Sequence, residues 1–255
     1  MTTILEAIIL GIVQGITEWL PVSSSGHLVL FQHFFKIEQP LILDLFLHLG
    51  SLAVVFFVFR NDLKKLILGI LRKEKVYLQY LSYLILATIP IGLVGFFFKD
   101  IVEAAFGNIK VVGYSFLFTA LIVFLSKYPQ QKEKSLTWKS GLIIGLGQAI
   151  AILPGVSRSG TTISTALMQG IKQEEAARFS FLLFIPAILG ATVLELTSIT
   201  PSSIENVPAI MAGVITTMIV GFFSLKLLLR IVHHQRFSSF AWYCLGLGIL
   251  IILFF

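Results

Sequence analysis

The sequence is poor in cysteine and in charge. Its single cysteine, Cys244, excludes a disulfide within the chain and any metal cluster built on cysteine thiolates. Only 13% of the 255 residues are charged, where about a quarter is usual for soluble domains, whereas 56% are hydrophobic and the mean hydropathy is +0.93. A chain with so few charges cannot cover a water-facing surface, so the composition predicts a polytopic membrane protein.

Two other absences concern targeting and partners. The first apolar run has neither the basic segment nor the small-residue cleavage site of a signal peptide, and it includes Glu6, so we expect it to be retained. The net charge of +6 does not require nucleic acid, because basic residues beside membrane spans follow from the positive-inside rule. The lipid bilayer is therefore the expected partner, and no nucleic acid is expected.

Eight apolar regions follow one another along the chain. A helix needs about 20 apolar residues to cross the hydrocarbon of a bilayer, and six regions have roughly that length. These six predicted spans cover residues 42–59, 78–98, 111–125, 179–196, 208–229 and 240–255. The other two regions are interrupted, at 4–20 followed by 28–35 and at 141–153 followed by 161–171. Their later arms are too short to span, so each region is predicted to be a re-entrant hairpin of two half-helices.

The charges of the loops predict the orientation of these spans. Residues 60–75 carry six basic side chains and residues 127–139 carry four, and Arg230 and Arg236 lie at the last loop, so these three loops are expected in the cytoplasm. Residues 99–110 have two lysines against two acidic residues, and residues 197–207 have no basic residue. Both of these loops are therefore expected outside.

One segment of the sequence is repeated. Residues 11–26 align without a gap on residues 145–160, and seven of the sixteen pairs are identical. Each half then has one hairpin and three spans, and an odd number of crossings turns the second half upside down relative to the first. The sequence predicts an all-α polytopic membrane protein of one domain, 1–255. We expect an inverted-topology repeat of halves 1–127 and 140–255, with six full transmembrane helices plus two re-entrant helical hairpins meeting near the midplane.

Polar side chains gather in both copies of the repeat. Ionisable groups at membrane depth cost on the order of 3 kcal/mol each, so such a gathering predicts a functional site. The first copy contains Gln14, Glu18, Ser23, Ser24, Ser25 and His27, and the second contains Gln148, Ser157, Arg158, Ser159, Thr161 and Thr162.

These residue types suit the chemistry of phosphate. Gln14 and Glu18 are four residues apart, on one helix face, and their oxygen atoms suit a hard divalent cation, either Mg²⁺ or Ca²⁺. Arg158 stands among hydroxyls at a predicted helix start, where a guanidinium and free N–H groups can bind an oxyanion. Phosphoryl transfer also needs a nucleophile in line and a proton acceptor, which a serine and His27 can supply.

Three other interpretations stay open. Glu18 and Arg158 can form a purely structural ion pair, with the serines satisfying the backbone of broken helices. Asp44 and His48, one helical turn apart, are interpreted as an interfacial pair, and the alternative that they face the same cavity stays open. The histidines near loops, His33, His233 and His234, are interpreted as interfacial, without catalytic roles. An inverted repeat around a midplane site is also typical of secondary carriers, so a transporter or lipid flippase without hydrolytic activity is the alternative function.

The stretches from Gln14 to His27 and from Leu153 to Thr162 resemble the two signature regions of the bacterial undecaprenyl-diphosphate phosphatases, the bacitracin-resistance family. The resemblance covers essentially the whole chain. It implies a divalent-cation-dependent enzyme of the bacterial plasma (inner) membrane. Such enzymes hydrolyse undecaprenyl diphosphate to undecaprenyl phosphate and inorganic phosphate, which recycles the lipid carrier for cell-wall synthesis. A homodimer is left open.

The resemblance also implies a role for each matching residue. Gln14 and Glu18 fill the Glu/Gln-x-x-x-Glu positions, with Glu18 expected at the metal, and glutamine at position 14 leaves one carboxylate instead of two. Ser24 matches the proposed nucleophile and His27 its assistant, although water activated by His27 stays open. The motif Pro-Gly-x-Ser-Arg-Ser-x-x-Thr, expected to hold the diphosphate, is matched by Ser157, Arg158, Ser159 and Thr162. Gln14, Ser23 and Ser25 complete the expected substrate-binding set.

Overall fold

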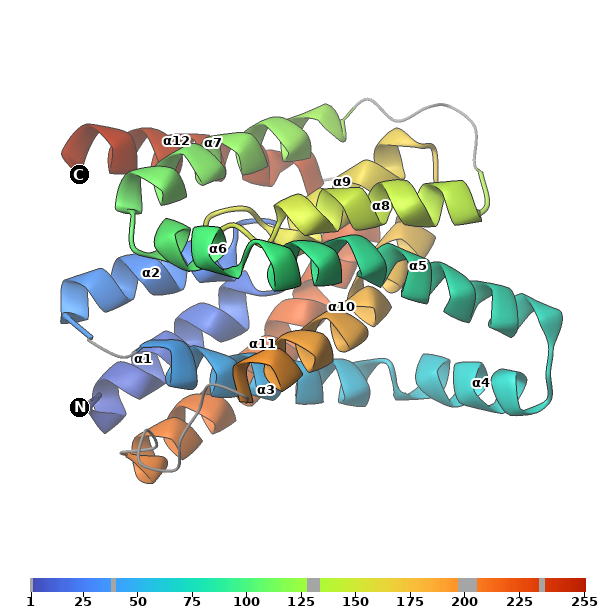
Figure 1. Cartoon of the computed structure of the whole chain (residues 1–255), viewed down its shortest axis with the longest axis horizontal. Coiled ribbons are helices and arrows are strands. Elements are labelled where there is room, and N and C mark those ends of the chain that lie inside the picture. Colours follow the sequence, from blue (N-terminus) through green and yellow to red (C-terminus); the bar gives the residue numbers. More distant parts are fainter. Residues whose placement is uncertain (1, 38–39, 128–133, 197–205, 234–236) are drawn as a thin grey trace.

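The computed structural model describes residues 2–37, 40–127, 134–196, 206–233 and 237–255 as a bundle of helices (Figure 1). Within these residues, four helices are long and apolar enough to cross a membrane: α5 (Lys75–Phe97), α10 (Gln173–Leu196), α11 (Val207–His233) and α12 (Phe240–Phe254), which follows the short 3-10 helix η2 (Phe237–Ser239). Two bent pairs meet the same criterion jointly: α3 (Pro40–Val58) with α4 (Arg60–Leu71), at 75°, and α6 (Lys99–Phe106) with α7 (Ile109–Leu125), at 98°. The chain is a polytopic membrane protein, as the composition predicts.

Each of the six predicted spans corresponds to one helix, namely α3, α5, α7, α10, α11 or α12. The prediction was wrong for two loops, because most of 60–75 forms α4 and most of 99–110 forms α6. Charge density alone marked these segments as loops, but α4 buries Leu66 and Gly69 on one face and keeps its basic residues on others. Of the other predicted loops, residues 128–133, 197–205 and 234–236 lie outside the described residues.

The two interrupted regions each form a pair of helices joined by a loop. α1 (Ile4–Thr17) leads into α2 (Ser24–Phe35), and α8 (Trp138–Ile150) leads into α9 (Arg158–Met168). Figure 1 shows α1 and α2 extending from the middle of the bundle toward the end where both chain termini lie, whereas α8 extends toward the opposite end, beside the α4–α5 connection. Both interrupting loops therefore lie inside the bundle.

Each helix pair packs against a helix distant in sequence. α1 lies along α11, and α8 lies along α5. A Cβ atom at Gly11 would lie 2.5 Å from the carbonyl oxygen of Gly213, and one at Gly145 would lie 2.5 Å from the carbonyl oxygen of Ala87. Only glycine allows backbones to approach so closely. This packing fixes the first helix of each pair and, with it, the loop that follows.

Aromatic rings pack in the centre of the bundle, and apolar side chains, both aliphatic and aromatic, cover much of its outside. Trp19 is fully buried and makes edge contacts with Phe181 and Phe184, whose ring centroids lie 5.9 and 5.4 Å away. On α5, by contrast, only 17% of the residues in its apolar 18-residue stretch are buried, and Leu93 and Phe96 are exposed. An apolar outer surface of this extent fits a lipid environment.

Candidate active site

The two interrupting loops touch each other. The Ser159 hydroxyl donates to the carbonyl oxygen of Leu20 at 3.2 Å. A Cβ atom at Gly26 would lie 2.8 Å from the Cα of Gly155, and one at Gly160 would lie 3.2 Å from the Cβ of Pro21. Because each loop presents a glycine to the other, the two can meet without a side chain between them.

Four serines organise the helix starts at this meeting point. Ser23 caps α2 by accepting from the backbone N–H of Gly26 at 3.2 Å, and Ser157 caps α9 by accepting from Gly160 N–H at 3.0 Å. The hydroxyls of Ser25 and Ser159 lie 3.2 and 3.3 Å from those of Ser23 and Ser157, respectively. Two helix N-termini therefore converge, each with partial positive charge that favours an anion.

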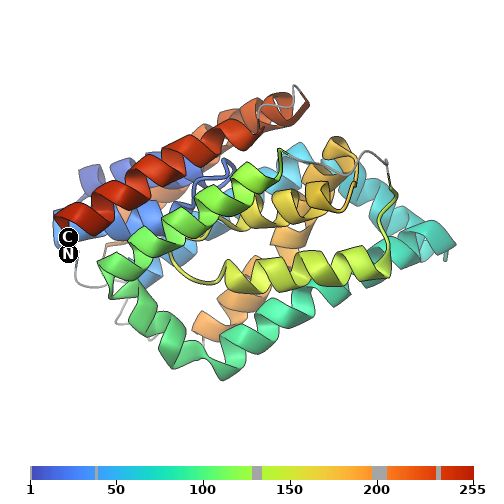
Figure 2. The same ribbon diagram turned by 90° about the horizontal axis from the view of Figure 1, so that it is seen from above.

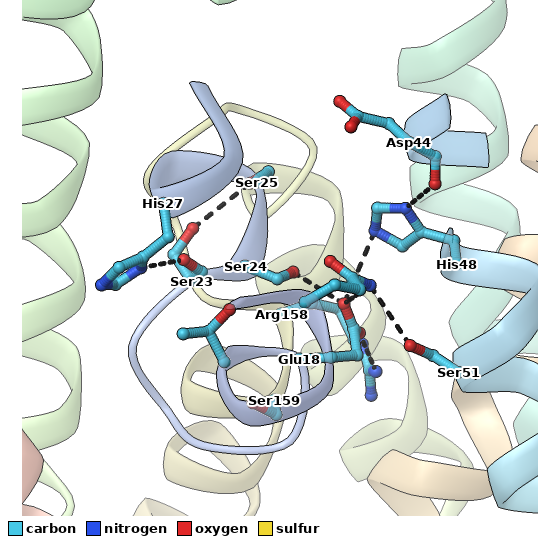
Figure 3. Close-up of polar contacts among 12 residues, drawn as sticks. Glu18, Ser23, Ser24, Ser25, His27, Asp44, His48, Ser51, Arg158 and Ser159 are labelled. Atoms are coloured by element: carbon cyan, nitrogen blue, oxygen red, sulfur yellow. Dashed lines mark hydrogen bonds and ion pairs between the residues drawn. The ribbon is translucent and has the colours of Figure 1, made fainter. Parts of the chain in front are cut away.

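Glu18 connects residues from both loops (Figure 3). Its side chain is buried, and its Oε1 accepts from Arg158 Nη2 at 2.8 Å. Its Oε2 accepts from the Ser24 hydroxyl at 2.6 Å and from Gln14 Nε2 at 3.1 Å. The structure thus brings together four of the predicted site residues, from positions up to 144 apart in the chain (158 − 14). The Glu18–Arg158 contact is also the ion pair that the structural interpretation expects.

Helix α10 supports the guanidinium of Arg158. The Arg158 Cζ lies 4.4 Å from the centroid of the Phe184 ring, and its Nη1 donates to the carbonyl oxygen of Ser180 at 3.2 Å. The Thr162 hydroxyl lies 2.6 Å from the Ser180 hydroxyl and donates to the carbonyl oxygen of Arg158 at 2.8 Å. Thr162 therefore contacts the helix behind Arg158, and its predicted role in holding substrate stays a prediction.

His27 lies on the side of Ser23 away from Glu18 (Figure 3). Its Nδ1 is 2.6 Å from the carbonyl oxygen of Ser23, and its Nε2 is 2.7 Å from the hydroxyl of Tyr243 on α12. The ring stacks on Tyr243, with the two planes 7° apart, and meets the edge of Phe116. Both ring nitrogens are engaged away from Ser24, so the assignment of His27 as the proton acceptor stays a prediction.

Helix α3 contributes two residues that the sequence interpretation did not place at the site. His48 Nε2 lies 3.5 Å from Glu18 Oε2, and His48 Nδ1 donates to the carbonyl oxygen of Asp44 at 2.7 Å. The Ser51 hydroxyl accepts from Gln14 Nε2 at 3.3 Å. The spacing of positions 44, 48 and 51 puts three polar residues on one face of an apolar span, and this pattern in the sequence could have placed His48 and Ser51 at the site.

The other histidines lie elsewhere. His33 makes an edge contact with Phe255, with ring centroids 5.5 Å apart, near the end of the bundle that holds the chain termini. His234 and the side chain of His233 lie outside the described residues.

The oxygen atoms around Glu18 fit a hard divalent cation. Gln14 Oε1 is buried and has no hydrogen-bond partner, so it offers an unused acceptor beside the Glu18 carboxylate. Among the residues that the structure describes, no group of three or more His, Cys, Asp or Glu side chains is arranged to hold a metal. A cation here would therefore depend on Gln14, Glu18 and oxygen atoms of a bound ligand, as Mg²⁺ commonly does with phosphates.

Comparisons with known proteins show the family to which the chain belongs. Residues 7–250 match the family described as Bacitracin resistance protein BacA. A protein of Methanobrevibacter smithii named undecaprenyl-diphosphatase is 42% identical, over 97% of this chain and 96% of its own. Proteins of the same name from Halothermothrix orenii and Oceanobacillus iheyensis are 40% and 38% identical, over 98% and 99% of this chain and 97% of each relative. The chain therefore belongs to the bacitracin resistance protein family of undecaprenyl-diphosphatases.

Proposed function

We propose that this chain hydrolyses undecaprenyl diphosphate to undecaprenyl phosphate and inorganic phosphate. The observation that carries the proposal is the position of Glu18, whose two carboxylate oxygens contact Ser24 at 2.6 Å and Arg158 at 2.8 Å. A hydroxyl, a carboxylate and a guanidinium in contact between two helix N-termini supply a nucleophile, a proton acceptor and an anion clamp. The full-length relatives bear the name of this activity.

Arg158 and the two helix starts bind the diphosphate in the proposed mechanism. Two donors of the Arg158 guanidinium and the N–H groups at the starts of α2 and α9 face negative oxygens of the substrate. Arg158 then exchanges its contact with Glu18 for one with phosphate, because the phosphate carries the greater negative charge. This exchange leaves the Glu18 carboxylate with Ser24 and Gln14 as hydrogen-bond partners.

Ser24 attacks the terminal phosphorus while its proton passes to Glu18. The bond from that phosphorus to the bridging oxygen breaks, and the prenyl monophosphate leaves with the electron pair. Water then attacks the phosphoserine, and the bond from phosphorus to the serine oxygen breaks. Glu18 returns its proton to that oxygen, which restores the serine hydroxyl as inorganic phosphate leaves. His27 acts in this scheme by holding the start of α2, through its contacts with Ser23 and Tyr243.

Two variants of this scheme use His27 differently. In one, His27 takes the Ser24 proton, which requires its ring to leave the Tyr243 hydroxyl. In the other, His27 activates water, and no phosphoserine forms. The 2.6 Å contact between Ser24 and Glu18 favours the scheme in which Glu18 is the acceptor.

We propose Glu18 and Gln14 as the residues that hold a divalent cation, Mg²⁺ or Ca²⁺. The unpartnered Gln14 Oε1 supports this assignment. Such a cation would supply positive charge to the phosphate oxygens.

We also propose that the two halves, 1–127 and 140–255, form an inverted-topology repeat. Under this proposal, helices α1, α2, α3, α5 and α7 correspond in turn to α8, α9, α10, α11 and α12. The packing supports it, because α1 on α11 matches α8 on α5, α3 on α11 matches α10 on α5, and α7 packs on its own counterpart α12. Ser23 and Ser157 also cap their helices alike. The proposed location is the bacterial plasma membrane, with residues 60–75 on the cytoplasmic side.

Phosphate release by the purified protein tests the proposed function. In detergent, with a divalent cation and a prenyl diphosphate, we expect phosphate to appear without any membrane gradient. Glu18→Ala and Arg158→Ala should abolish release, and His33→Ala, far from the site, should not change it. A carrier or flippase would release no phosphate, and that result from well-folded protein would overturn the proposal.

A further inference from the structure

A groove lies in the angle between α3 and α4, at the end of the bundle opposite the chain termini. It has a volume of about 390 Å³ and is lined by Phe56, Arg60, Leu63, Lys64, Ile67 and Leu68. We call it the elbow groove. Its walls are apolar, apart from the two basic side chains at Arg60 and Lys64, and it is separate from the Glu18 site.

The two cations of the elbow groove have no acidic partner. Arg60 and Lys64 are one helical turn apart on α4, where two like charges repel. The acidic residue between them, Asp62, pairs instead with Arg178 of α10, with Asp62 Oδ1 3.3 Å from Arg178 Nε. In the part of the chain that the structure describes, no carboxylate lies within 4.0 Å of either cation. The Cζ of the Arg60 guanidinium lies 5.1 Å from the centroid of the Phe57 ring.

The rest of the groove face of α4 is exposed and aliphatic. Ile67 is 55% and Leu68 is 40% exposed, whereas the opposite face turns Leu66 and Gly69 inward, with Gly69 against Tyr77 of α5. α4 is thus held to the bundle by one face and presents cations followed by aliphatic side chains on another. Basic side chains beside aliphatic ones on one exposed face suit a helix at the boundary between lipid headgroups and acyl chains, where the charged ends reach the headgroups.

The direction of α4 differs from that of α3, as expected for a helix that lies at the headgroup level of a membrane. α4 is bent by 75° from α3, and it lies at the end of the bundle away from the chain termini (Figure 2). The same segment, 60–75, carries six basic residues, which associate with the anionic leaflet of a membrane.

We propose that the elbow groove binds an anionic phospholipid. The lipid phosphate lies between Arg60 and Lys64 and supplies the negative charge that they lack. One acyl chain lies against Phe56, Leu63, Ile67 and Leu68. A soluble anion would leave this apolar wall exposed to water, and a zwitterionic lipid would return a positive charge to a site that already holds two.

Lipid binding by the full-length protein tests this proposal without reference to phosphatase activity. Phe56→Trp places a fluorophore in the groove, and brominated phosphatidylglycerol or brominated phosphatidylcholine in mixed micelles quenches it on contact. The parent protein, with its three native tryptophans, provides the background signal. The variant Arg60→Gln/Lys64→Gln removes both groove cations. Lys65→Gln/Lys75→Gln removes the same charge from the same segment outside the groove.

We expect half-maximal quenching at a concentration of phosphatidylglycerol at least tenfold lower than of phosphatidylcholine. Arg60→Gln/Lys64→Gln should remove that preference, as loss of about 1 kcal/mol per basic residue implies, and Lys65→Gln/Lys75→Gln should retain it. Equal quenching by the two lipids, or equal loss in both double variants, would overturn the proposal. Displacement of the brominated phosphatidylglycerol by an equimolar prenyl diphosphate would also overturn it, because the groove would then belong to the substrate.

Discussion

Glu18 follows the end of α1 and Ser24 begins α2, and across the loop between these helices the Ser24 hydroxyl donates to Glu18 Oε2 at 2.6 Å. The loop between them turns the chain back at Ser23, whose φ of 65° lies in the left-handed region. This backbone turn places the Ser24 hydroxyl against the carboxylate before any substrate is present.

Replacing Ser24 by alanine distinguishes attack by the Ser24 hydroxyl from direct attack by water. If Ser24 attacks phosphorus, Ser24→Ala should lower kcat by at least about 100-fold, because the covalent step is lost. The measurement is phosphate release under saturating prenyl diphosphate. Mass spectrometry of rapidly quenched enzyme should show a phosphorylated peptide containing residue 24 in the parent only. Substantial activity in Ser24→Ala would favour direct attack by water. Ser25→Ala is the matched control and should lose far less, because the Ser25 hydroxyl contacts the Ser23 hydroxyl, whereas that of Ser24 contacts Glu18.

Replacing Arg158 by lysine keeps the charge and removes the guanidinium fork. Arg158 contacts Glu18 and Ser180 through two different nitrogens, a geometry that one ammonium group cannot reproduce. We expect Arg158→Lys to lower kcat/KM by about 10- to 100-fold while the protein still folds, since the pair with Glu18 keeps opposite charges. Initial rates at subsaturating substrate measure this loss. Full activity of Arg158→Lys would show that the fork has no role.

Replacing Gln14 by glutamate tests the cation site. A second carboxylate beside Glu18 should lower the concentration of Mg²⁺ or Ca²⁺ required for half-maximal activity by about tenfold, because hard cations bind carboxylates better than amides. Titration of chelator-treated enzyme with each cation gives that concentration. Gln148→Glu, at the equivalent position of α8, should not produce the same gain. An unchanged requirement in Gln14→Glu would remove position 14 from the cation site.

Replacing Tyr243 by phenylalanine tests whether His27 has a positioning role. The change removes the hydroxyl that contacts His27 Nε2 and keeps the stacked ring. We expect a loss of stability of about 1 kcal/mol, measured as a lower midpoint of thermal unfolding in detergent, and a kcat within about threefold of the parent. If His27 must leave Tyr243 to act as the base, Tyr243→Phe should instead raise kcat.

Replacing Gly26 by alanine should separate the two loops. The new Cβ would lie 2.7 Å from the Phe116 ring and 2.8 Å from Gly155 Cα, so one of them must move. We expect at least a tenfold loss of kcat/KM, because Ser24 and Arg158 lie on opposite loops. Gly92→Ala on α5 is the matched control, since nothing lies within 4 Å of the new methyl group, and it should preserve activity. Unchanged activity in Gly26→Ala would contradict a need for close contact between the loops.

The sequence could predict the spans and the interrupted helices because both depend on local patterns of apolar length and of Gly, Pro and Ser. It also singled out Glu18, Ser24 and Arg158, because ionisable and hydroxyl groups at membrane depth need a reason. Whether two such residues touch depends on packing, and the sequence analysis left an ion pair between Glu18 and Arg158 as an alternative.

Contacts between elements distant in the chain could not be predicted from the sequence. His48 reaches Glu18 only because α3 lies beside α1, and Tyr243 meets His27 across 216 positions. The helices α4 and α6 were missed because charged residues were taken as a sign of loops, although an amphipathic helix accommodates them at a membrane surface.

The pairing of Glu18 with Arg158 has a consequence for how the protein is made. The two residues are 140 positions apart, so the ribosome delivers the first hairpin, with its carboxylate, long before the guanidinium exists. Until then the early chain carries an uncompensated charge that costs on the order of 3 kcal/mol at membrane depth. The first hairpin is therefore expected to settle fully into the bilayer only after the second has been synthesised, which makes its insertion a late event in biogenesis.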